Sequence, residues 1–295
     1  MADKPVAEVE VTAELVRALL RAQHPDLAEL PLTLVAEGWD NAMWRLGDGL
    51  AVRLPRRELA APLVEHEQRW LPVLAPTLPV PVPVPVREGR PGQGYPWSWS
   101  VLPWIEGRHA IELAREDTGP LVRPLAGFVA SLHRPASSDA PLNPLRGVRL
   151  AERDAILRGR LPALPPASRE PAERVWAAAL AAPPWDAPPV WLHGDLHPGN
   201  LVVADDGSLA GVVDFGDLCS GDPAVDLAVA WCLFDAEGRD RFVELVAATH
   251  PEPDAAWRRA RGWALSFATA LLTRSDDNPE YLALGERTLA AVLEG

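Results

Sequence analysis

Apolar residues near the N-terminus recur at helical spacing, and the pattern then changes to short runs separated by turn residues. Thr12 precedes the helical stretch, which should end near Pro25, and a threonine in this place favours a helix start. Residues 32–36 are a predicted strand. Residues 42–46 and 50–54 flank an Asp-Gly turn, which is a strong hairpin signal. The chain therefore begins with a helix and a small antiparallel sheet.

Residues 58–74 are a predicted helix that carries a charged residue on its apolar stripe. Glu67 lies four residues after Leu63 and three before Trp70, so it faces the same side as both. A carboxylate on the core side of a helix is costly unless a cation meets it. Pro72 is awkward in a helix interior and is expected to shorten this one.

A run of alternating proline and valine, residues 79–86, cannot be helical and is expected to form a stiff, extended connector. An aromatic-rich strand follows at residues 97–102, and the pattern breaks directly after it. We place the domain boundary at this break. It gives an N-terminal, nucleotide-binding lobe of residues 1–103 and a C-terminal, catalytic and substrate-binding lobe of residues 104–295.

Helical periodicity dominates the rest of the chain. Residues 121–133 predict a helix, whereas residues 135–171 are rich in proline and irregular, apart from a short helical piece at 151–158. Residues 190–192 form a short apolar strand before the most polar motif of the chain. After Asp226 the sequence is helical nearly to its end. A β-rich part followed by an α-rich part indicates the α+β class.

Composition and charge limit the classes of ligand and partner that the protein is expected to bind. The 295 residues are 48% hydrophobic and 23% charged, as in ordinary globular proteins. The net charge of -13 disfavours nucleic acid and anionic membranes and favours cationic ligands or bridging metal ions, although acidity can also serve solubility alone. No apolar run is long enough to span a membrane, and no signal peptide is expected. Cys219 and Cys232 are expected to be reduced, so we expect a cytoplasmic protein.

The strongest chemical signal is residues 193–200, His-Gly-Asp-Leu-His-Pro-Gly-Asn. A predicted hairpin, residues 201–213, follows and brings Asn200 and Asp214 together at its open ends. An amide oxygen and a carboxylate at neighbouring strand ends suit Mg²⁺. Asp195 faces the same cavity from the preceding loop, where a general base for a substrate hydroxyl should be. This spacing also matches the kinase catalytic template.

These motifs resemble those of the aminoglycoside phosphotransferase family, which shares the protein-kinase fold and includes macrolide phosphotransferases, choline kinases and homoserine kinases. Residues 193–200 resemble the family's catalytic loop, residues 214–216 its metal-binding motif, and residues 221–228 the segment that follows. The resemblance begins at residues 38–41 and reaches the terminal helices. It implies a bilobal protein-kinase-like fold, with a small antiparallel sheet in the N-lobe and a larger, mostly helical C-lobe.

The resemblance also implies roles for individual residues. Asp195 would be the catalytic base, and Asn200 and Asp214 would hold Mg²⁺. His193 would brace the catalytic loop, and Asp226 would support it from the start of the following helix. The implied reaction is in-line transfer of the γ-phosphoryl group of ATP or GTP to a hydroxyl group of a small molecule.

Two positions depart from the kinase pattern. Gly38 alone represents the glycine-rich loop, so nearby backbone N–H groups, with Asn41, would have to cap the phosphates. Arg53 stands where a strand lysine is expected. Arginine is permanently charged and grips phosphate or carboxylate through two hydrogen bonds. We therefore expect Arg53 to pair with Glu67 and to touch the α- and β-phosphates, and a purely structural ion pair is the alternative.

The adenine is expected beside residues 102–105, where backbone groups of the segment between the lobes could bind it. Leu102 and Trp104 are the candidate contacts, although packing in an aromatic core is the alternative role for the tryptophans of this region. These residues do not distinguish ATP from GTP, and the chain is expected to be a monomer or a homodimer.

Two interpretations of a different kind compete with a kinase. His193, Asp195 and His197 could form a zinc hydrolase site, but Pro198 and Gly199 remove the helix that would align them. A non-catalytic pseudokinase that binds nucleotide is the other alternative. The thin glycine loop favours it, and the intact catalytic residues disfavour it.

The acceptor is expected to be a cationic, amine-bearing hydroxylated molecule, such as an aminoglycoside or macrolide antibiotic, whose phosphorylation would give resistance. Acidic residues of the C-terminal part could attract its amines, or could form a solvated surface. They are Asp217, Asp222, Asp235, Glu237, Asp240, Asp276, Asp277 and Glu280. A metabolic alcohol of the choline or homoserine type is the alternative acceptor.

Overall fold

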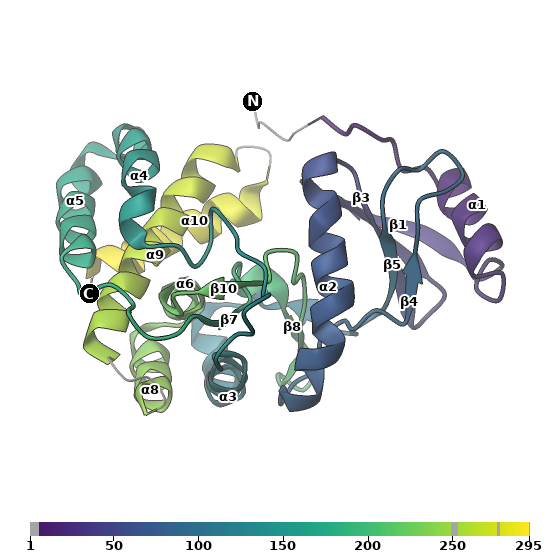
Figure 1. Ribbon diagram of the computed structural model, residues 1–295. Coiled ribbons are helices and arrows are strands. Elements are labelled where there is room, and N and C mark those ends of the chain that lie inside the picture. Colours follow the sequence, from purple (N-terminus) through teal and green to yellow (C-terminus); the bar gives the residue numbers. More distant parts are fainter. Residues whose placement is uncertain (1–5, 249–252, 276–277, 295) are drawn as a thin grey trace. The chain divides into compact units, whose positions relative to one another are not determined.

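The computed structural model describes residues 6–248, 253–275 and 278–294 (Figure 1). Contacts divide the chain into two compact units. The N-terminal unit comprises the described residues up to Thr77 together with Pro81–Glu106, and the C-terminal unit comprises Leu78–Val80 and the described residues from Gly107 on. Glu106, the last residue of the N-terminal unit, pairs with Arg45 of the same unit at 2.5 Å.

The N-terminal unit is built on a five-stranded antiparallel sheet in the order β1-β2-β3-β5-β4. The strands are β1 (Leu32–Glu37), β2 (Asn41–Leu46), β3 (Leu50–Pro55), β4 (Arg87–Gly89) and β5 (Trp99–Pro103). The predicted hairpin is confirmed, since β2 and β3 pair with Met43 opposite Arg53 and Leu46 opposite Leu50. This register places Arg53 in the middle of the sheet.

Two helices complete this unit. α1 (Ala13–Gln23) begins as predicted, with the Thr12 hydroxyl accepting a hydrogen bond from Leu15 N at 3.3 Å. α2 (Ala61–Leu74) contains Pro72 and continues past it. The expected shortening of this helix was wrong, because Trp70 and Leu74 are buried on either side of the proline and their packing offsets the missing hydrogen bond.

The C-terminal unit is mostly helical and contains two small sheets, one in the order β6-β8-β9 and one that pairs β10 with β7. The strands are β6 (Arg108–His109), β7 (Val190–Leu192), β8 (Leu201–Val203), β9 (Leu209–Val212) and β10 (Cys219–Gly221). The helices are α3 (Val122–Leu132), α4 (Asp154–Arg160), α5 (Pro166–Leu180), α6 (Ala224–Leu227), α7 (Val229–Leu233), α8 (Ala236–Ala247), α9 (Pro253–Arg274) and α10 (Pro279–Glu294).

Helix α5 was not predicted, because Pro165, Pro166 and Pro171 make this stretch look irregular. Tertiary packing explains the helix. Ala179 is buried against α9, where a side-chain carbon at Gly262 would lie 2.6 Å from the Cβ of Ala179. The contact between α5 and α9 therefore stabilises a helix that local propensity does not favour.

The structure also bears on the expected state of the cysteines and on membrane-spanning helices. Cys219 and Cys232 are confirmed as free thiols, and both are buried. Among the helices that the structure describes, none combines the length and the apolar character needed to cross a bilayer.

Candidate active site

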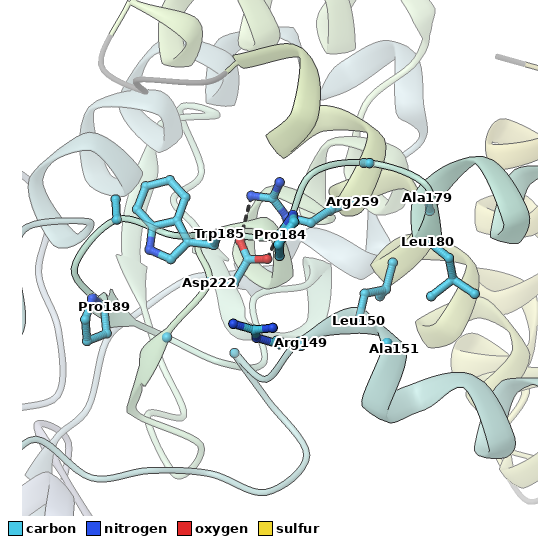
Figure 2. Close-up of a pocket in the computed structure, with 14 residues that line it drawn as sticks. Arg149, Leu150, Ala151, Ala179, Leu180, Pro184, Trp185, Pro189, Asp222 and Arg259 are labelled. Atoms are coloured by element: carbon cyan, nitrogen blue, oxygen red, sulfur yellow. Dashed lines mark hydrogen bonds and ion pairs between the residues drawn. The ribbon is translucent and has the colours of Figure 1, made fainter.

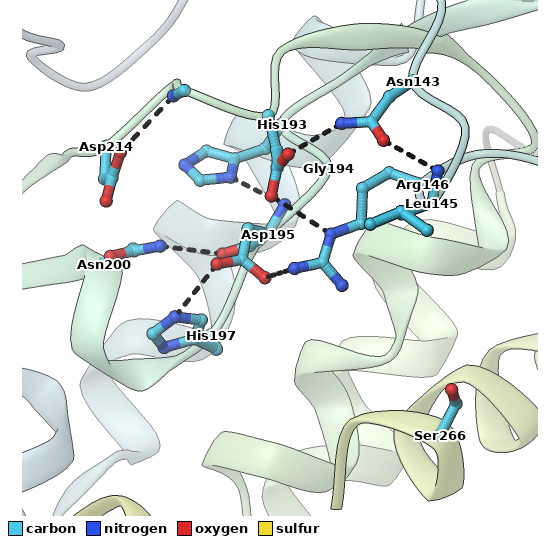
Figure 3. Close-up of polar contacts among 12 residues, drawn as sticks. Asn143, Leu145, Arg146, His193, Gly194, Asp195, His197, Asn200, Asp214 and Ser266 are labelled. Carbon is cyan, nitrogen blue, oxygen red and sulfur yellow. Dashed lines mark hydrogen bonds and ion pairs between the residues drawn. The ribbon is translucent and has the colours of Figure 1, made fainter. Parts of the chain in front are cut away.

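The loop of residues 193–200 connects β7 to β8 and lies against the segment that follows β9. Gly194 has a φ of +84°, and a Cβ at this position would lie 2.3 Å from the Asp217 carbonyl oxygen. Only glycine fits both the left-handed backbone and the close approach. The loop, whose Asp195 is shown in Figure 3, therefore passes close to the backbone of Asp217.

The Asp226 carboxylate organises the start of this loop. It is fully buried and accepts hydrogen bonds from His193 N at 2.8 Å and from Gly194 N at 2.9 Å. His133 Nε2 lies 3.1 Å from the same carboxylate. A charged acceptor satisfies two buried backbone N–H groups, which otherwise would have no partner within the loop.

The His193 side chain also braces the loop through hydrogen bonds and is not free to bind a metal ion. Its Nδ1 accepts a hydrogen bond from Asp195 N at 3.2 Å, and its Nε2 lies 3.0 Å from the Val213 carbonyl oxygen, to which it can donate. Both ring nitrogens are therefore in use. Within the described part of the chain, no group of three or more His, Cys, Asp or Glu residues is arranged to hold a metal ion. The zinc hydrolase interpretation was wrong for this reason.

Asn200 and Asp214 lie at adjacent ends of the β8–β9 hairpin. Val213 N donates to the Asn200 carbonyl oxygen at 2.9 Å, which extends the hairpin to its open end. Asn200 Nδ2 donates to the Asp195 carbonyl oxygen at 2.9 Å, so its Oδ1 points away from that bond, toward the side on which Asp214 lies (Figure 3). An amide oxygen and a carboxylate fit Mg²⁺, which takes its remaining ligands from phosphates and water.

An arginine that the sequence analysis missed contacts Asp195. Arg146 Nη2 lies 2.6 Å from Asp195 Oδ1 (Figure 3). Its Nε lies 3.2 Å from Asp217 Oδ2. Asn143 donates to the other oxygen of Asp217 at 2.7 Å. The segment around Arg146 has no periodicity and no motif spacing, so no local signal could have indicated this contact.

These charges determine the protonation state of Asp195. Burial opposes ionisation, but the positive charge of Arg146 and a hydrogen bond with His197 outweigh it and hold the pKa of Asp195 well below its ordinary value. Burial raises the pKa of Asp217, and the adjacent Asp195 charge adds to this in spite of Arg146. Asp195 is thus a carboxylate at neutral pH, able to accept a proton but held by an ion pair.

The remaining predicted residues lie in the N-terminal unit. Arg53 is 3% exposed, and its Nη1 lies 2.5 Å from Glu67 Oε1, so the predicted pairing is confirmed. With its amide oxygen turned toward the guanidinium, Asn41 accepts from Arg53 Nη2 at 2.9 Å and from Nε at 3.2 Å. Glu67 and Asn41 together fix the orientation of Arg53.

Gly38 lies in the turn between β1 and β2, where its N donates to the Asn41 carbonyl oxygen at 2.8 Å. Leu102 is buried within β5. Trp104 N donates to the Gly49 carbonyl oxygen at 2.9 Å, and the Arg45 guanidinium lies 4.2 Å from the centre of the Trp104 ring. The roles of Gly38, Leu102 and Trp104 toward a nucleotide stay predictions.

Some of the acidic residues expected to attract a cationic acceptor are engaged within the protein. Asp217 is bound by Arg146. Asp222 lies in the wall of a cavity of about 420 Å³, where Arg259 Nε and Nη2 reach its two oxygens at 2.7 and 3.2 Å (Figure 2). Asp235 caps α8, and Glu237 pairs with Arg241. Asp240 and Glu280 are exposed. Asp276 and Asp277 lie outside the described residues.

Comparison with known proteins identifies the family. Residues 31–263 match the family described as "Phosphotransferase enzyme family". The chain belongs to this family. The fold of this phosphotransferase family member resembles the solved structure of the GDP and kanamycin complex of APH(2″)-IIIa, with a TM-score of 0.70. The two sequences are 18% identical, and the match covers 94% of this chain and 97% of that one. The likeness confirms the protein-kinase-like fold that the sequence predicted.

Two relatives of known name match part of this phosphotransferase family member. It is 31% identical over 144 residues to an aminoglycoside 3'-phosphotransferase of Escherichia coli, covering 46% of this chain and 53% of that protein. It is 33% identical over 114 residues to a homoserine kinase of Granulibacter bethesdensis, covering 37% of this chain and 35% of that protein. The chain spans about half the length of the first of these relatives.

Proposed function

We propose that this protein transfers the γ-phosphoryl group of ATP or GTP to a hydroxyl group of a small molecule. The observation that carries the proposal is the hydrogen bond between Asn200 Nδ2 and the Asp195 carbonyl oxygen. It links the loop that bears the proposed base to the hairpin end that bears the proposed metal ligands, Asn200 and Asp214. The family membership supports the same reaction.

The chemistry would proceed by in-line displacement. When bound at Asn200 and Asp214, Mg²⁺ would offset the negative charge of the phosphate oxygens. Asp195 would orient the acceptor hydroxyl and take its proton while the hydroxyl oxygen bonds to the γ-phosphorus. The bond from that phosphorus to the bridging oxygen breaks, the nucleoside diphosphate leaves with the electron pair, and the proton on Asp195 passes to solvent.

For the nucleotide, we propose the contacts expected from the sequence. Arg53, held by Glu67 and Asn41, would contact the phosphates, together with backbone N–H groups near Gly38. The base would lie near Leu102 and Trp104. The rigid mounting of Arg53 supports the first assignment, because a guanidinium fixed by two neighbours loses little side-chain entropy when it binds an anion.

Two acceptor classes are candidates. A hydroxylated antibiotic is supported by the relatives that are named as aminoglycoside phosphotransferases. A small hydroxy acid of the homoserine type is supported by the homoserine kinase relative and by the arginine beside Asp195. The deciding test incubates purified protein with Mg-ATP or Mg-GTP and kanamycin, a macrolide, choline and homoserine. Transfer is detected as a mass gain of one phosphoryl group, and nucleotide turnover without any phosphorylated acceptor would favour a pseudokinase.

Replacing Asp214 with alanine is expected to weaken the binding of Mg-nucleotide about tenfold or more, because one of the two proposed metal ligands is lost. Calorimetry measures the affinity with and without Mg²⁺. Asp206→Ala is the matched control, since Asp206 is exposed at the other end of the same hairpin. Unchanged affinity in Asp214→Ala would contradict the metal assignment.

A further inference from the structure

We call Arg146, Arg153 and Arg160 of the C-terminal unit the arginine row, after their regular spacing in the sequence. Arg146 contacts Asp195, and Arg153 and Arg160 follow at intervals of seven residues. Seven residues are about two helical turns, so Arg153, just before α4, and Arg160, at its end, face the same side. Arg160 Nη1 donates to the Ser266 carbonyl oxygen of α9 at 3.2 Å, which turns this side toward α9.

Arg153 is the least compensated member of this arginine row. It is 6% exposed, and its Nε is buried without a hydrogen-bond partner. Within the described ranges, neither Arg153 nor Arg160 forms an ion pair with a carboxylate, whereas Arg158 on the same helix pairs with Asp154 at 2.8 Å. A buried guanidinium without a counter-charge is costly, and an anionic ligand would reduce that cost.

The arginines also act on one another. Burial lowers the pKa of Arg153, and the charges of Arg146 and Arg274 lower it further. Burial lowers the pKa of Arg160 to about 10, with contributions from Arg274, Arg153 and Arg146. Each charge is therefore close enough to the others to repel them, and an anion placed among them would relieve several repulsions at once.

The position of Arg146, the first member of the arginine row, indicates which substrate the row would meet. Figure 3 shows Asn200 and Asp214 on one side of Asp195 and Arg146 on the other. The proposed metal ligands, and with them the nucleotide phosphates, occupy the first side. An anion bound by the arginines therefore belongs to the acceptor that presents its hydroxyl to Asp195.

We propose that the acceptor carries an anionic group, a carboxylate or a phosphate ester, that binds to Arg146, Arg153 and Arg160. This inference rests on the proposed phosphotransferase function and specifies its substrate class. The acceptor's anion would compete with Asp195 for Arg146.

The test uses inorganic phosphate and acetate as separate probes, added to protein that is first titrated with Mg-ADP and then kept saturated with it. Calorimetry is expected to show at least one of the two anions binding in the millimolar range. Arg153→Gln and Arg160→Gln should each weaken this binding about tenfold, as expected for losing a hydrogen bond to a charged group. Arg158→Gln, the matched control on α4, should leave it unchanged.

The outcomes separate this inference from the proposed function. Phosphate alone would indicate a phosphate ester, and acetate binding would indicate a carboxylate. If Mg-ADP binds and neither anion does, or if binding is the same in Arg153→Gln as in the unchanged protein, the anionic acceptor is ruled out and the phosphotransferase stands. Failure of Mg-ADP to bind would overturn the proposed function. In that case, anion binding that Arg153→Gln weakens would still show that the arginines form an anion site, and no anion binding would overturn the inference as well. Phosphate binding lost in Asp214→Ala but kept in Arg153→Gln would place the ion beside the nucleotide and also overturn the inference.

Discussion

The Asp195→Asn variant is expected to lose phosphoryl transfer by a factor of about 10²–10⁴, the range that general bases contribute. Asparagine has the shape of aspartate but cannot take a proton from the acceptor hydroxyl. Nucleotide binding should be kept, because Asn200 donates to the backbone carbonyl oxygen of residue 195 and not to its side chain. The loss should therefore appear in kcat and not in the affinity for nucleotide.

Single-turnover phosphorylation of an acceptor found in the screen measures this loss, and calorimetry measures the nucleotide affinity. Asp240→Asn is a suitable control, since Asp240 is an exposed aspartate of the same unit. Transfer within a few-fold of the unchanged protein in Asp195→Asn would refute the assignment of the base. A parallel loss of nucleotide affinity would instead indicate that the substitution disturbs the loop.

Replacing Asp226 with alanine is expected to lower the free energy of unfolding by about 3–5 kcal/mol. The variant leaves His193 N and Gly194 N buried without the acceptor that each now has. His133 loses its carboxylate neighbour as well. Because these groups position the loop that carries Asp195, transfer should fall together with stability.

Urea unfolding followed by tryptophan fluorescence gives the change in stability. Asp240→Ala, the exposed control, should change it by less than about 0.5 kcal/mol. Asp226→Asn should fall between the two, because an amide offers one acceptor oxygen where the carboxylate offers two. An Asp226→Ala variant as stable as the control would show that the loop does not depend on these hydrogen bonds.

The net charge of the chain and the charges close to Asp195 are different kinds of information about the acceptor. The net charge of -13 suggested a cationic acceptor. In the folded protein, however, Asp217 and Asp222 are bound by Arg146 and Arg259. Net charge sums over the whole surface, whereas a ligand meets only the side chains gathered at one place. The proposal of an anionic acceptor depends on Arg153 and Arg160, which have no carboxylate partner among the described residues.

Local patterns in the sequence were enough to predict most elements and the central motif. The cap at Thr12, the hairpin of β2 and β3, and the strand ends at Asn200 and Asp214 depend on residues that are close in sequence. The charged Glu67 on an apolar stripe required a cation, and Arg53 supplies it. Periodicity and turn chemistry act over a few residues, so they can be recognised without knowing the fold.

The tertiary structure alone decided the rest. Arg146 reaches Asp195 across 49 positions of the chain, and Asp226 reaches the loop of Gly194 across 32. Helix α5 exists because α9 covers it, in spite of its prolines. Neither spacing nor propensity encodes contacts of this kind, because they depend on how distant segments pack and on which charges are buried together.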